Sequence, residues 1–171
     1  MDFLTLEYLK NGSEIQKRIL QVLENHQIFQ KLKTYNPILA GTFPIEINIE
    51  GSDLDIILET DDFEILKKLL IIEFQDQEQF TINLIEINDV ECMVCKFQLE
   101  EFPVELFAQD RPTHLQNAYL HMIKEFEILE REGDEFRRKI IELKEQGFKT
   151  EPAFAKLLGL SGNPYVELLK Y

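Results

Sequence analysis

Two aspartates separated by a single leucine, Asp53 and Asp55, are the side chains in this sequence best placed to hold a cation. The stretch around them, Ser52-Asp53-Leu54-Asp55-Ile56, reads as an extended segment. Alternate side chains of a strand share a face, so the two Cβ atoms are roughly 6.5 Å apart. Like charges at that distance repel by roughly 2.5 kcal/mol at an effective dielectric constant of about 20. Unless water solvates the pair well, we expect a cation between them.

A glycine and a threonine, Gly41 and Thr42, precede this pair at a characteristic distance, because Asp53 follows Gly41 by twelve positions. A Gly-hydroxyl turn after a strand, followed by an Asp-x-Asp strand, resembles the signature of the nucleotidyltransferase superfamily. The segments 116–122 and 149–155, together with the overall length, resemble an uncharacterised bacterial domain family placed in that fold. The members of that family have no assigned reaction, so the resemblance implies a fold more than a function.

The resemblance implies a Mg²⁺ site built from three acids. Mg²⁺ prefers carboxylate oxygens and retained waters, and it offsets the negative charge that spreads over a phosphoryl group under attack. Asp53 and Asp55 supply two ligands, and the third acid of the superfamily comes from a later strand. We choose Glu105, which is flanked by apolar residues and therefore points away from their face, with Glu91 and Glu86 as weaker substitutes. The candidate catalytic and metal-binding residues are thus Asp53, Asp55 and Glu105.

Four residues are candidate contacts to a nucleotide phosphate: Gly41, Thr42, Ser52 and Arg111. A small residue after a strand lets backbone N–H groups approach a phosphate, and a hydroxyl adds a further donor. Arg111 lies in the loop that leaves the Glu105 strand, where a guanidinium suits phosphate recognition. A surface salt bridge with the surrounding acids is an equally good interpretation of Arg111.

The segment that follows Thr42 counts against catalysis. Phe43-Pro44-Ile45-Glu46 lacks the second glycine or the basic residue often found after such a turn, and Pro44 removes one backbone donor. The nearest bases in the sequence lie outside the motif, at Lys67, Lys68, Lys96 and Arg111.

Two functions therefore stay open. The first is Mg²⁺-dependent transfer of a nucleoside monophosphate from a nucleoside triphosphate to an unknown small-molecule or protein acceptor. The second is a non-catalytic domain on the same fold that binds a nucleotide or a protein partner. A Glu105 that is buried, or that faces away from the two aspartates, would exclude the enzyme.

A polar stripe of His114, Asn117, His121 and Lys124 recurs at helical spacing. It either lines a pocket beside Glu105 or forms a solvated face of its helix. We favour the solvated face, because the stripe lies well over a quarter turn from the apolar stripe of the same helix.

The two cysteines, Cys92 and Cys95, have the C-x-x-C spacing of redox and zinc sites. They lie in an expected strand, where an offset of three places the side chains on opposite faces. Redox pairs sit at helix starts, and a structural zinc ion needs four ligands, for which no second Cys/His pair is present. We interpret both as packed thiols.

The chain is strongly acidic, with 32 acids against 18 bases and a formal net charge of −14. This charge repels nucleic acid and anionic membrane surfaces at long range, which argues against a nucleic-acid partner. No stretch approaches the roughly 20 apolar residues of a membrane span, and the start of the chain lacks the features of a signal peptide. We expect a soluble, cytoplasmic protein.

Apolar alternation predicts the strands that position these residues, over 35–40, 54–58, 80–87, 90–99 and 102–107, with a half-exposed extended segment over 45–49. Asn88-Asp89 predicts a hairpin turn. Pro103 indicates a position near a strand start or at a sheet edge.

Helical periodicity and capping signals predict helices over 3–10, 14–32, 61–74, 112–132 and 134–146, and two short ones starting near 150 and 163. His26 lies in the apolar stripe of the second helix, and we expect it in the core. The order of elements favours an α+β domain with a mixed sheet. We expect a nucleotidyltransferase-like core over 1–112 and a helical extension over 113–171 packed on it as one compact unit.

Overall fold

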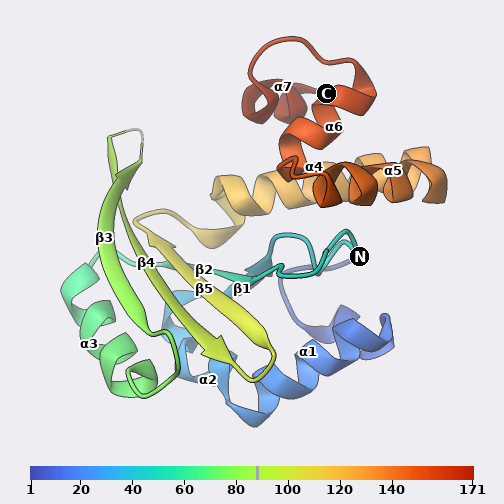
Figure 1. Cartoon of the computed structure of the whole chain (residues 1–171). Coiled ribbons are helices and arrows are strands. Elements are labelled where there is room, and N and C mark those ends of the chain that lie inside the picture. The colour runs from blue at the N-terminus through green and yellow to red at the C-terminus, as the bar shows by residue number, and fades with distance from the viewer. Residues whose placement is uncertain (88) are drawn as a thin grey trace.

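A mixed sheet with the strand order β1-β2-β5-β4-β3 forms the centre of the computed structural model, which describes residues 1–87 and 89–171 (Figure 1). The strands are β1 (Ile38–Ala40), β2 (Leu54–Glu59), β3 (Thr81–Ile87), β4 (Val90–Leu99) and β5 (Phe102–Gln109). Strands β2 and β5 are parallel, and the other neighbouring pairs are antiparallel. The expected α+β architecture with a mixed sheet is confirmed.

Helices occupy both faces of the sheet. They are η1 (Glu7–Asn11), α1 (Glu14–Asn25), α2 (Ile28–Lys31), η2 (Lys33–Tyr35), α3 (Phe63–Phe74), η3 (Thr113–Leu115), α4 (Asn117–Glu132), α5 (Asp134–Glu145), α6 (Thr150–Leu158) and α7 (Pro164–Lys170). Among the described residues, none of these helices has the length and apolar character needed to cross a bilayer.

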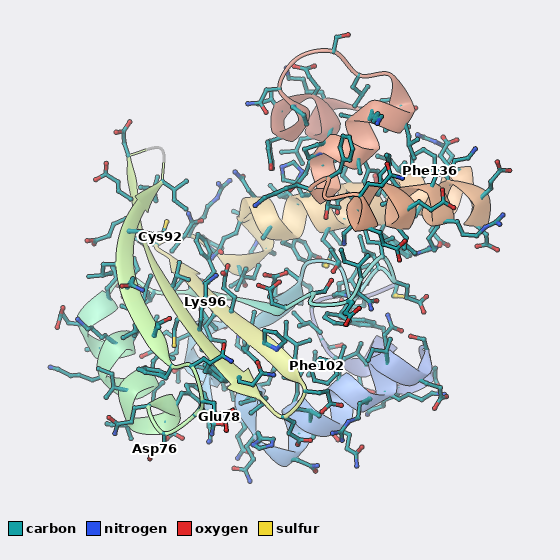
Figure 2. All side chains as sticks on the ribbon, viewed as in Figure 1. Asp76, Glu78, Cys92, Lys96, Phe102 and Phe136 are labelled. Atoms are coloured by element: carbon teal, nitrogen blue, oxygen red, sulfur yellow. The ribbon has the colours of Figure 1, made fainter. Side chains whose placement is uncertain are left out.

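Two hydrophobic cores lie on opposite faces of the sheet. Helices α1 to α3 bury Ile19, Leu66 and Phe74 with apolar residues of β2, β4 and β5 on one face. Helices α4 to α7 bury Met122 and Phe154 with residues of β1 and β2 on the other. Figure 2 shows side chains filling both layers, with Phe102 at the sheet and Phe136 among the upper helices. The division into a core over 1–112 and an extension over 113–171 stays a prediction.

The central strand β5 follows the expected alternation. Its residues are alternately buried and partly exposed, so Val104 and Leu106 enter the first core while Glu105 points to the other face. Pro103 is the second residue of β5, so the prediction of a position near a strand start is confirmed. The alternative of an edge strand does not apply, because β5 is the central strand of the sheet. The hairpin between β3 and β4 is also present, and Asp89 has φ +62°. Asn88 lies outside the described residues.

Several helix boundaries differ from the predictions for local reasons. Gln27 adopts a left-handed conformation with φ +54°, which divides the expected helix over 14–32 into α1 and α2. Helix α3 starts at Phe63, two residues later than predicted, because Asp62 is the cap and accepts a hydrogen bond from the backbone N–H of Ile65. Extended backbone at Gln116 separates η3 from α4. Asn163 caps α7 as predicted, by accepting from the N–H of Tyr165.

The segment over 45–49 is a loop, so the prediction of a half-exposed extended segment is wrong. Ile45 and Ile47 are both buried in the second core. Their alternation with polar residues arises because a turn over 43–46, rather than a strand, exposes Glu46 between them. Alternation alone does not distinguish a strand from a loop that is anchored by two apolar side chains.

The two cysteines are buried free thiols, as predicted. Cys95 packs in the first core, and burial raises its pKa to about 12. Cys92 faces the other way, where its sulfur accepts a hydrogen bond from the side chain of Gln109.

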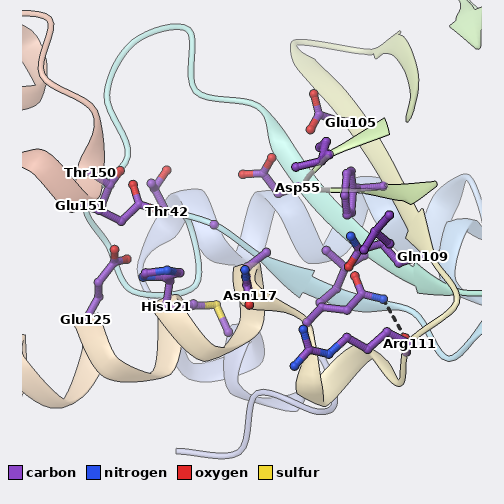
Figure 3. A pocket seen from close by; sticks show the side chains of 18 residues that line it. Thr42, Asp55, Glu105, Gln109, Arg111, Asn117, His121, Glu125, Thr150 and Glu151 are labelled. Carbon is purple, nitrogen blue, oxygen red and sulfur yellow. Dashed lines mark hydrogen bonds between the residues drawn. The ribbon is translucent and has the colours of Figure 1, made fainter. Parts of the chain in front are cut away.

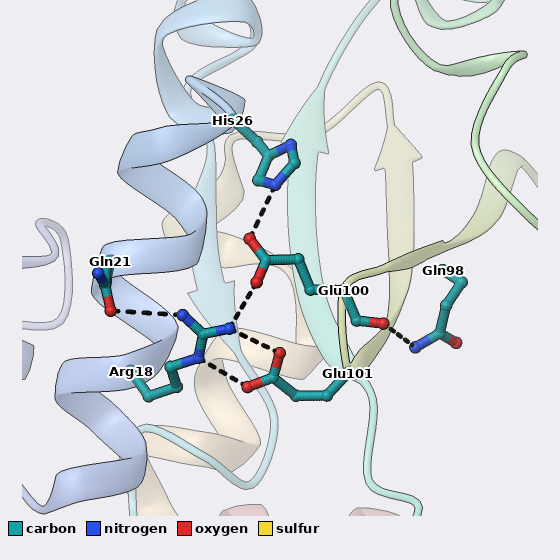
Figure 4. A network of polar contacts seen from close by, with 6 residues as sticks. All are labelled: Arg18, Gln21, His26, Gln98, Glu100 and Glu101. Atoms are coloured by element: carbon teal, nitrogen blue, oxygen red, sulfur yellow. Dashed lines mark hydrogen bonds and ion pairs between the residues drawn. The ribbon is translucent and has the colours of Figure 1, made fainter.

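His26 lies at the surface, so its prediction as a core histidine is wrong. Helix α1 ends at Asn25, and the imidazole Nε2 is 2.9 Å from Glu100 Oε1 in the turn between β4 and β5 (Figure 4). Arg18 pairs with the same turn through Glu100 and, in a bidentate contact, Glu101. These contacts hold α1 to the end of the sheet.

Candidate functional site

Two cavities lie between the sheet and the C-terminal helices. The main cavity, of about 570 Å³, is lined by five of the predicted site residues: Gly41, Thr42, Asp55, Glu105 and Arg111 (Figure 3). A side cavity of about 270 Å³ contains the other two, Ser52 and Asp53, and shares Thr42 and Asp55 with the main one. The structure thus brings the predicted residues together around Asp55.

The parallel pairing of β2 with β5 places two of the acids side by side. Asp55 is the register partner of Glu105, and partners on neighbouring strands are separated by about 4.8 Å. Leu54 and Val104, which flank them in sequence, are buried in the first core, so both carboxylates point to the cavity face. The side chain of Glu105 is 25% exposed. Glu105 is therefore neither buried nor turned away from Asp55.

Asp53 precedes β2 and lines the side cavity next to Asp55. The pKa of Asp55 is raised to about 7, first by burial and then by the negative charges of Asp53 and Glu105. The repulsion expected from the sequence is thus present, and it falls mainly on Asp55. The weaker candidates Glu86 and Glu91 face each other on the exposed β3–β4 hairpin and line neither cavity.

Gly41 makes the close approach of Asp55 possible. Its φ is +75°, and a Cβ atom built on it would lie 2.0 Å from Asp55 Oδ2. A side chain at this position would therefore both strain the backbone and displace the carboxylate. The glycine is needed for the geometry of the acids as well as for the turn.

The other three predicted phosphate contacts, Thr42, Ser52 and Arg111, lie at different positions around the two cavities. Thr42 lines both cavities, while Ser52 lines the side cavity and its Oγ accepts a hydrogen bond from the N–H of Ile49 at 2.9 Å. Arg111 is exposed at the edge of the main cavity, and its backbone carbonyl accepts from the side chain of Gln116. Only its side chain is thus available to reach into the cavity.

Lys96 already compensates part of the acidic charge. It is the register partner of Glu105 on the antiparallel strand β4, and its Nζ is 2.6 Å from Glu105 Oε2. The hydrogen bond with Glu105 raises the pKa of Lys96. The lysine is more than half exposed, so the pair can open without breaking core contacts.

Lys144 is a cation of the site that the sequence prediction missed. It comes from α5, is buried, and lines the side cavity with both aspartates. Burial lowers its pKa to about 8, although acids of the cavity, with Glu125 first and Asp55 next, act in the opposite direction. Its position was visible in the sequence, because Lys144 follows Ile140 by four residues on the buried stripe of α5.

Side chains of two helices hold the loop after Gly41 in place. Gln16 of α1 donates to the carbonyls of Phe43 and Pro44 at 3.0 and 3.1 Å. From α5, Arg137 donates to the carbonyl of Ile45 and Lys144 Nζ donates to that of Ile47 at 2.6 Å. The loop that seemed poor in phosphate-binding features is therefore rigidly positioned, and one of its anchors is a lysine beside the aspartates.

The polar stripe of His114, Asn117, His121 and Lys124 divides between cavity and solvent. His121 is buried on α4 and lines the main cavity together with Asn117, so the prediction of a solvated face is wrong for His121. His114 lies in η3 and is exposed, as that prediction required. The reason is that Glu151 of α6 and Tyr165 of α7 lie beside His121, which the sequence of α4 alone does not indicate. Two acids that sequence reasoning missed, Glu125 and Glu151, lie beside His121.

Charge and shape make the Asp55 end of the cavity suitable for a divalent cation and a phosphate. Carboxylate oxygens from β2 and β5 are the donors that a hard cation takes, and a glycine turn and a lysine lie next to them. This arrangement fits phosphoryl-group chemistry, in which carboxylates hold the cation and the glycine turn and the lysine lie near the phosphate.

Solved structures with the same fold are polymerases and transferases of nucleotides. The Cid1 poly(U) polymerase with MgGTP bound has a TM-score of 0.53 at 9% identity, covering 75% of this chain and 41% of that chain. The polymerase core of TRAMP, an RNA surveillance complex, has a TM-score of 0.52 at 13% identity, covering 92% and 49%. The GLD-2/RNP-8 complex has a TM-score of 0.51 at 16% identity, covering 88% and 62%.

At these identities the likeness establishes the nucleotidyltransferase-like fold, which confirms the resemblance seen in the sequence. The chain spans less than two thirds of the length of each of these proteins. A search of curated proteins found no significant match. The family described as "Domain of unknown function (DUF4269)" matches residues 21–171, and the chain belongs to that family.

Proposed function

We propose that the chain binds a nucleoside triphosphate with Mg²⁺ and transfers its nucleoside monophosphate group to a small-molecule or protein acceptor. The observation that carries this proposal is the pairing of Asp55 with Glu105 on parallel strands, directly beside the Gly41 turn. The nucleotidyltransferase-like fold supports it. The net charge of −14 favours an acceptor other than nucleic acid.

The acids of the site fit Mg²⁺ by an observation independent of the fold. Burial and the charges of Asp53 and Glu105 raise the pKa of Asp55 to about 7. A cation placed beside Asp55 would therefore stabilise its carboxylate. Asp53, Asp55 and Glu105 would hold the ion through their carboxylate oxygens. When bound, Mg²⁺ supplies positive charge that offsets the negative charge on the transferring group.

Neighbouring residues would hold the phosphates of the nucleotide. The turn at Gly41 brings backbone close to the acids, and the hydroxyls of Thr42 and Ser52 add donors. Lys144 supplies the cation whose absence near the motif counted against catalysis, and Arg111 stands at the edge of the main cavity. These groups would orient the α-phosphate for attack from the cavity side.

The transfer itself exchanges one phosphorus–oxygen bond for another. An acceptor oxygen forms a bond to the α-phosphorus while the bond from that phosphorus to the bridging oxygen breaks. Pyrophosphate leaves with the electron pair, and the acceptor hydroxyl loses its proton to a carboxylate of the site or to water. The chain's residues bind, orient and compensate charge throughout, and none forms a covalent intermediate.

A non-catalytic nucleotide-binding or protein-binding domain is the second candidate. The contact of Lys96 with Glu105 favours it, because an internal cation already neutralises the third acid. In an enzyme, Lys96→Met should free Glu105 and strengthen Mg²⁺ binding. In a non-catalytic domain the same change should leave Mg²⁺ binding unaltered.

Calorimetric titration with Mg²⁺ and a non-hydrolysable nucleoside triphosphate tests the binding step. We expect the Asp53→Ala/Asp55→Ala variant to bind about tenfold more weakly or worse. The matched control is Glu86→Gln/Glu91→Gln, which also removes two facing acids but outside both cavities. Equal binding by all three proteins would contradict the enzyme and a nucleotide-binding domain that uses the aspartates, and would leave the protein-binding domain.

Label transfer from an α-³²P nucleoside triphosphate separates the two candidates. Transfer to a small-molecule extract or to protein by the wild type, but not by the double aspartate variant, supports the enzyme. Nucleotide binding that depends on the aspartates, with no transfer and no pyrophosphate release, supports the non-catalytic domain.

A further inference from the structure

His121, Glu125 and Glu151 form a second polar cluster in the wall of the main cavity, away from Asp55 and Glu105 (Figure 3). His121 and Glu125 are four residues apart on α4, so they share one face of the helix. Glu151 comes from the first turn of α6. Each of the three residues offers one potential ligand atom, and these three atoms all lie within 4.8 Å of one another.

Two side chains of this cluster each carry a buried atom that has no hydrogen-bond partner among the described residues. Glu125 is 4% exposed and His121 is 6% exposed. Among the described residues, neither Glu125 Oε1 nor His121 Nδ1 has a partner. Leaving such groups unsatisfied costs about 1–3 kcal/mol each. Both atoms belong to side chains that converge on the same point, which indicates a missing ligand there.

Lys144 does not satisfy either unpartnered atom. It comes from α5, and its Nζ donates to the carbonyl of Ile47. Among the described residues, Glu125 Oε1 and His121 Nδ1 therefore stay without a partner.

We propose that His121, Glu125 and Glu151 bind a divalent transition-metal ion, with Zn²⁺ as the type, at a site separate from the Asp53, Asp55 and Glu105 cluster. One imidazole nitrogen and two carboxylates form a mixed donor set that suits Zn²⁺ better than Mg²⁺. Three protein ligands leave a coordination position open, and all three residues line the main cavity. That position would bind water or a donor atom of a molecule in the cavity.

The present separation of the ligand atoms is close to what a bound ion requires. A tetrahedral site with bonds of about 2.1 Å places its ligand atoms roughly 3.4 Å apart. Atoms within 4.8 Å of one another therefore approach by at most about 1.4 Å per pair when an ion binds. Glu151 is only half-buried at the start of its helix, so its side chain can make this adjustment.

Titration of Zn²⁺ into the full chain, after removal of metal with a chelator, tests the site. We expect binding with a dissociation constant on the order of micromolar. His121→Asn and Glu125→Gln should each weaken it about tenfold or more. Asp53→Ala/Asp55→Ala should bind Zn²⁺ like the wild type while losing Mg²⁺-nucleotide binding. Failure of this site and failure of the proposed function are thereby distinguishable.

A further measurement identifies the ligands. Co²⁺ in place of Zn²⁺ should give a visible absorption spectrum that is lost in His121→Asn. Circular dichroism establishes folding of each variant.

Several outcomes would overturn the site. These are Zn²⁺ binding that is equal in wild type, His121→Asn and Glu125→Gln, binding lost only in the aspartate variant, or no binding at micromolar Zn²⁺. If His121→Asn fails to fold, Glu125→Gln and Glu151→Gln decide, because both keep the side-chain shape and Glu151 is partly exposed.

Discussion

The sheet cluster (Asp53, Asp55 and Glu105) and the helix cluster (His121, Glu125 and Glu151) line the same cavity region but manage their negative charge differently. In the sheet cluster, strand register forces the acids together and Lys96 pairs with one of them. In the helix cluster, buried atoms have no partner among the described residues. Burial raises the pKa of one acid in each cluster, but strand register also supplies the sheet cluster with a lysine that pairs with Glu105.

Lys144 connects the two clusters. Its pKa responds to Glu125 and Glu151 of the helix cluster and to Asp53 and Asp55 of the sheet cluster. A single buried ammonium group therefore serves acids from both the β-sheet and the C-terminal helices. Variants on either side of it can show whether the two clusters are independent.

Gly41→Ala should have the largest effect and should act on the sheet cluster alone. The new Cβ would collide with Asp55 Oδ2, and a positive φ costs a non-glycine residue about 1 kcal/mol. We expect Mg²⁺-nucleotide binding to fall about tenfold or more in calorimetry, with Zn²⁺ binding unchanged. Gly51→Ala is the matched control, since Gly51 also has a positive φ but no atom within 4 Å of the added Cβ. Equal losses in both variants would contradict the role of the Asp55 contact.

Lys144→Met should destabilise the fold by about 2 kcal/mol, because it leaves the buried carbonyl of Ile47 without a donor. Urea denaturation monitored by circular dichroism measures this free energy of unfolding. Adding Glu125→Gln should recover part of the loss if the lysine also compensates the helix cluster. Strict additivity of the two changes would show that Lys144 and Glu125 do not interact.

Asp55→Asn should stabilise the metal-free protein by about 1 kcal/mol at pH 7.5. The folded-state pKa of about 7 lies above the ordinary aspartate value of 3.8. Between these values the folded chain holds a proton that the unfolded chain has lost, so wild-type stability falls as pH rises from about 4 to about 7. We expect the gain of the variant to disappear at pH 4. A pH-independent difference in urea midpoint would contradict this origin, and added Mg²⁺ should stabilise only the wild type.

Arg18→Ala removes an ion-pair network at the surface, which serves as a comparison for the two cavity clusters. It should have the smallest effect on the free energy of unfolding. Arg18 makes bidentate contact with Glu101 and also binds Glu100, but all three side chains are solvent-exposed to a substantial degree. Exposed ion pairs contribute little and are screened by salt. We expect a small fall in urea midpoint that vanishes in high salt. A fall as large as that of Lys144→Met would contradict the distinction between surface and cavity charges.

The sequence predicted the site correctly where the local apolar pattern of a strand agrees with the way that strand pairs in the sheet. The apolar residues that flank Asp55 and Glu105 predicted which face the acids occupy, and the structure places them as register partners. The Gly41 turn was also correctly located, although the sequence did not show that the glycine accommodates the carboxylate of Asp55.

Predictions failed where a distant helix determines the environment. His121 looked solvated because only α4 was considered, but Glu151 of α6 and Tyr165 of α7 lie beside it. Ile45 and Ile47 looked like strand residues, but donors from α1 and α5 fix a loop there. Lys144 lay on an apolar stripe and was overlooked because a lysine four residues after Ile140 is usually exposed. Long-range packing is the information that these local patterns lack.

Two of the hydrogen bonds that hold the loop after Gly41 can form only late in the synthesis of the chain. Arg137 and Lys144 are translated about 90 residues after the carbonyls that they bind. A nascent chain that has completed the sheet contains the Gln16 anchor of this loop but not the two anchors from α5. The site therefore matures only when α5 docks, and a chain truncated before α5 should keep its strands but lose the ordered geometry around Gly41.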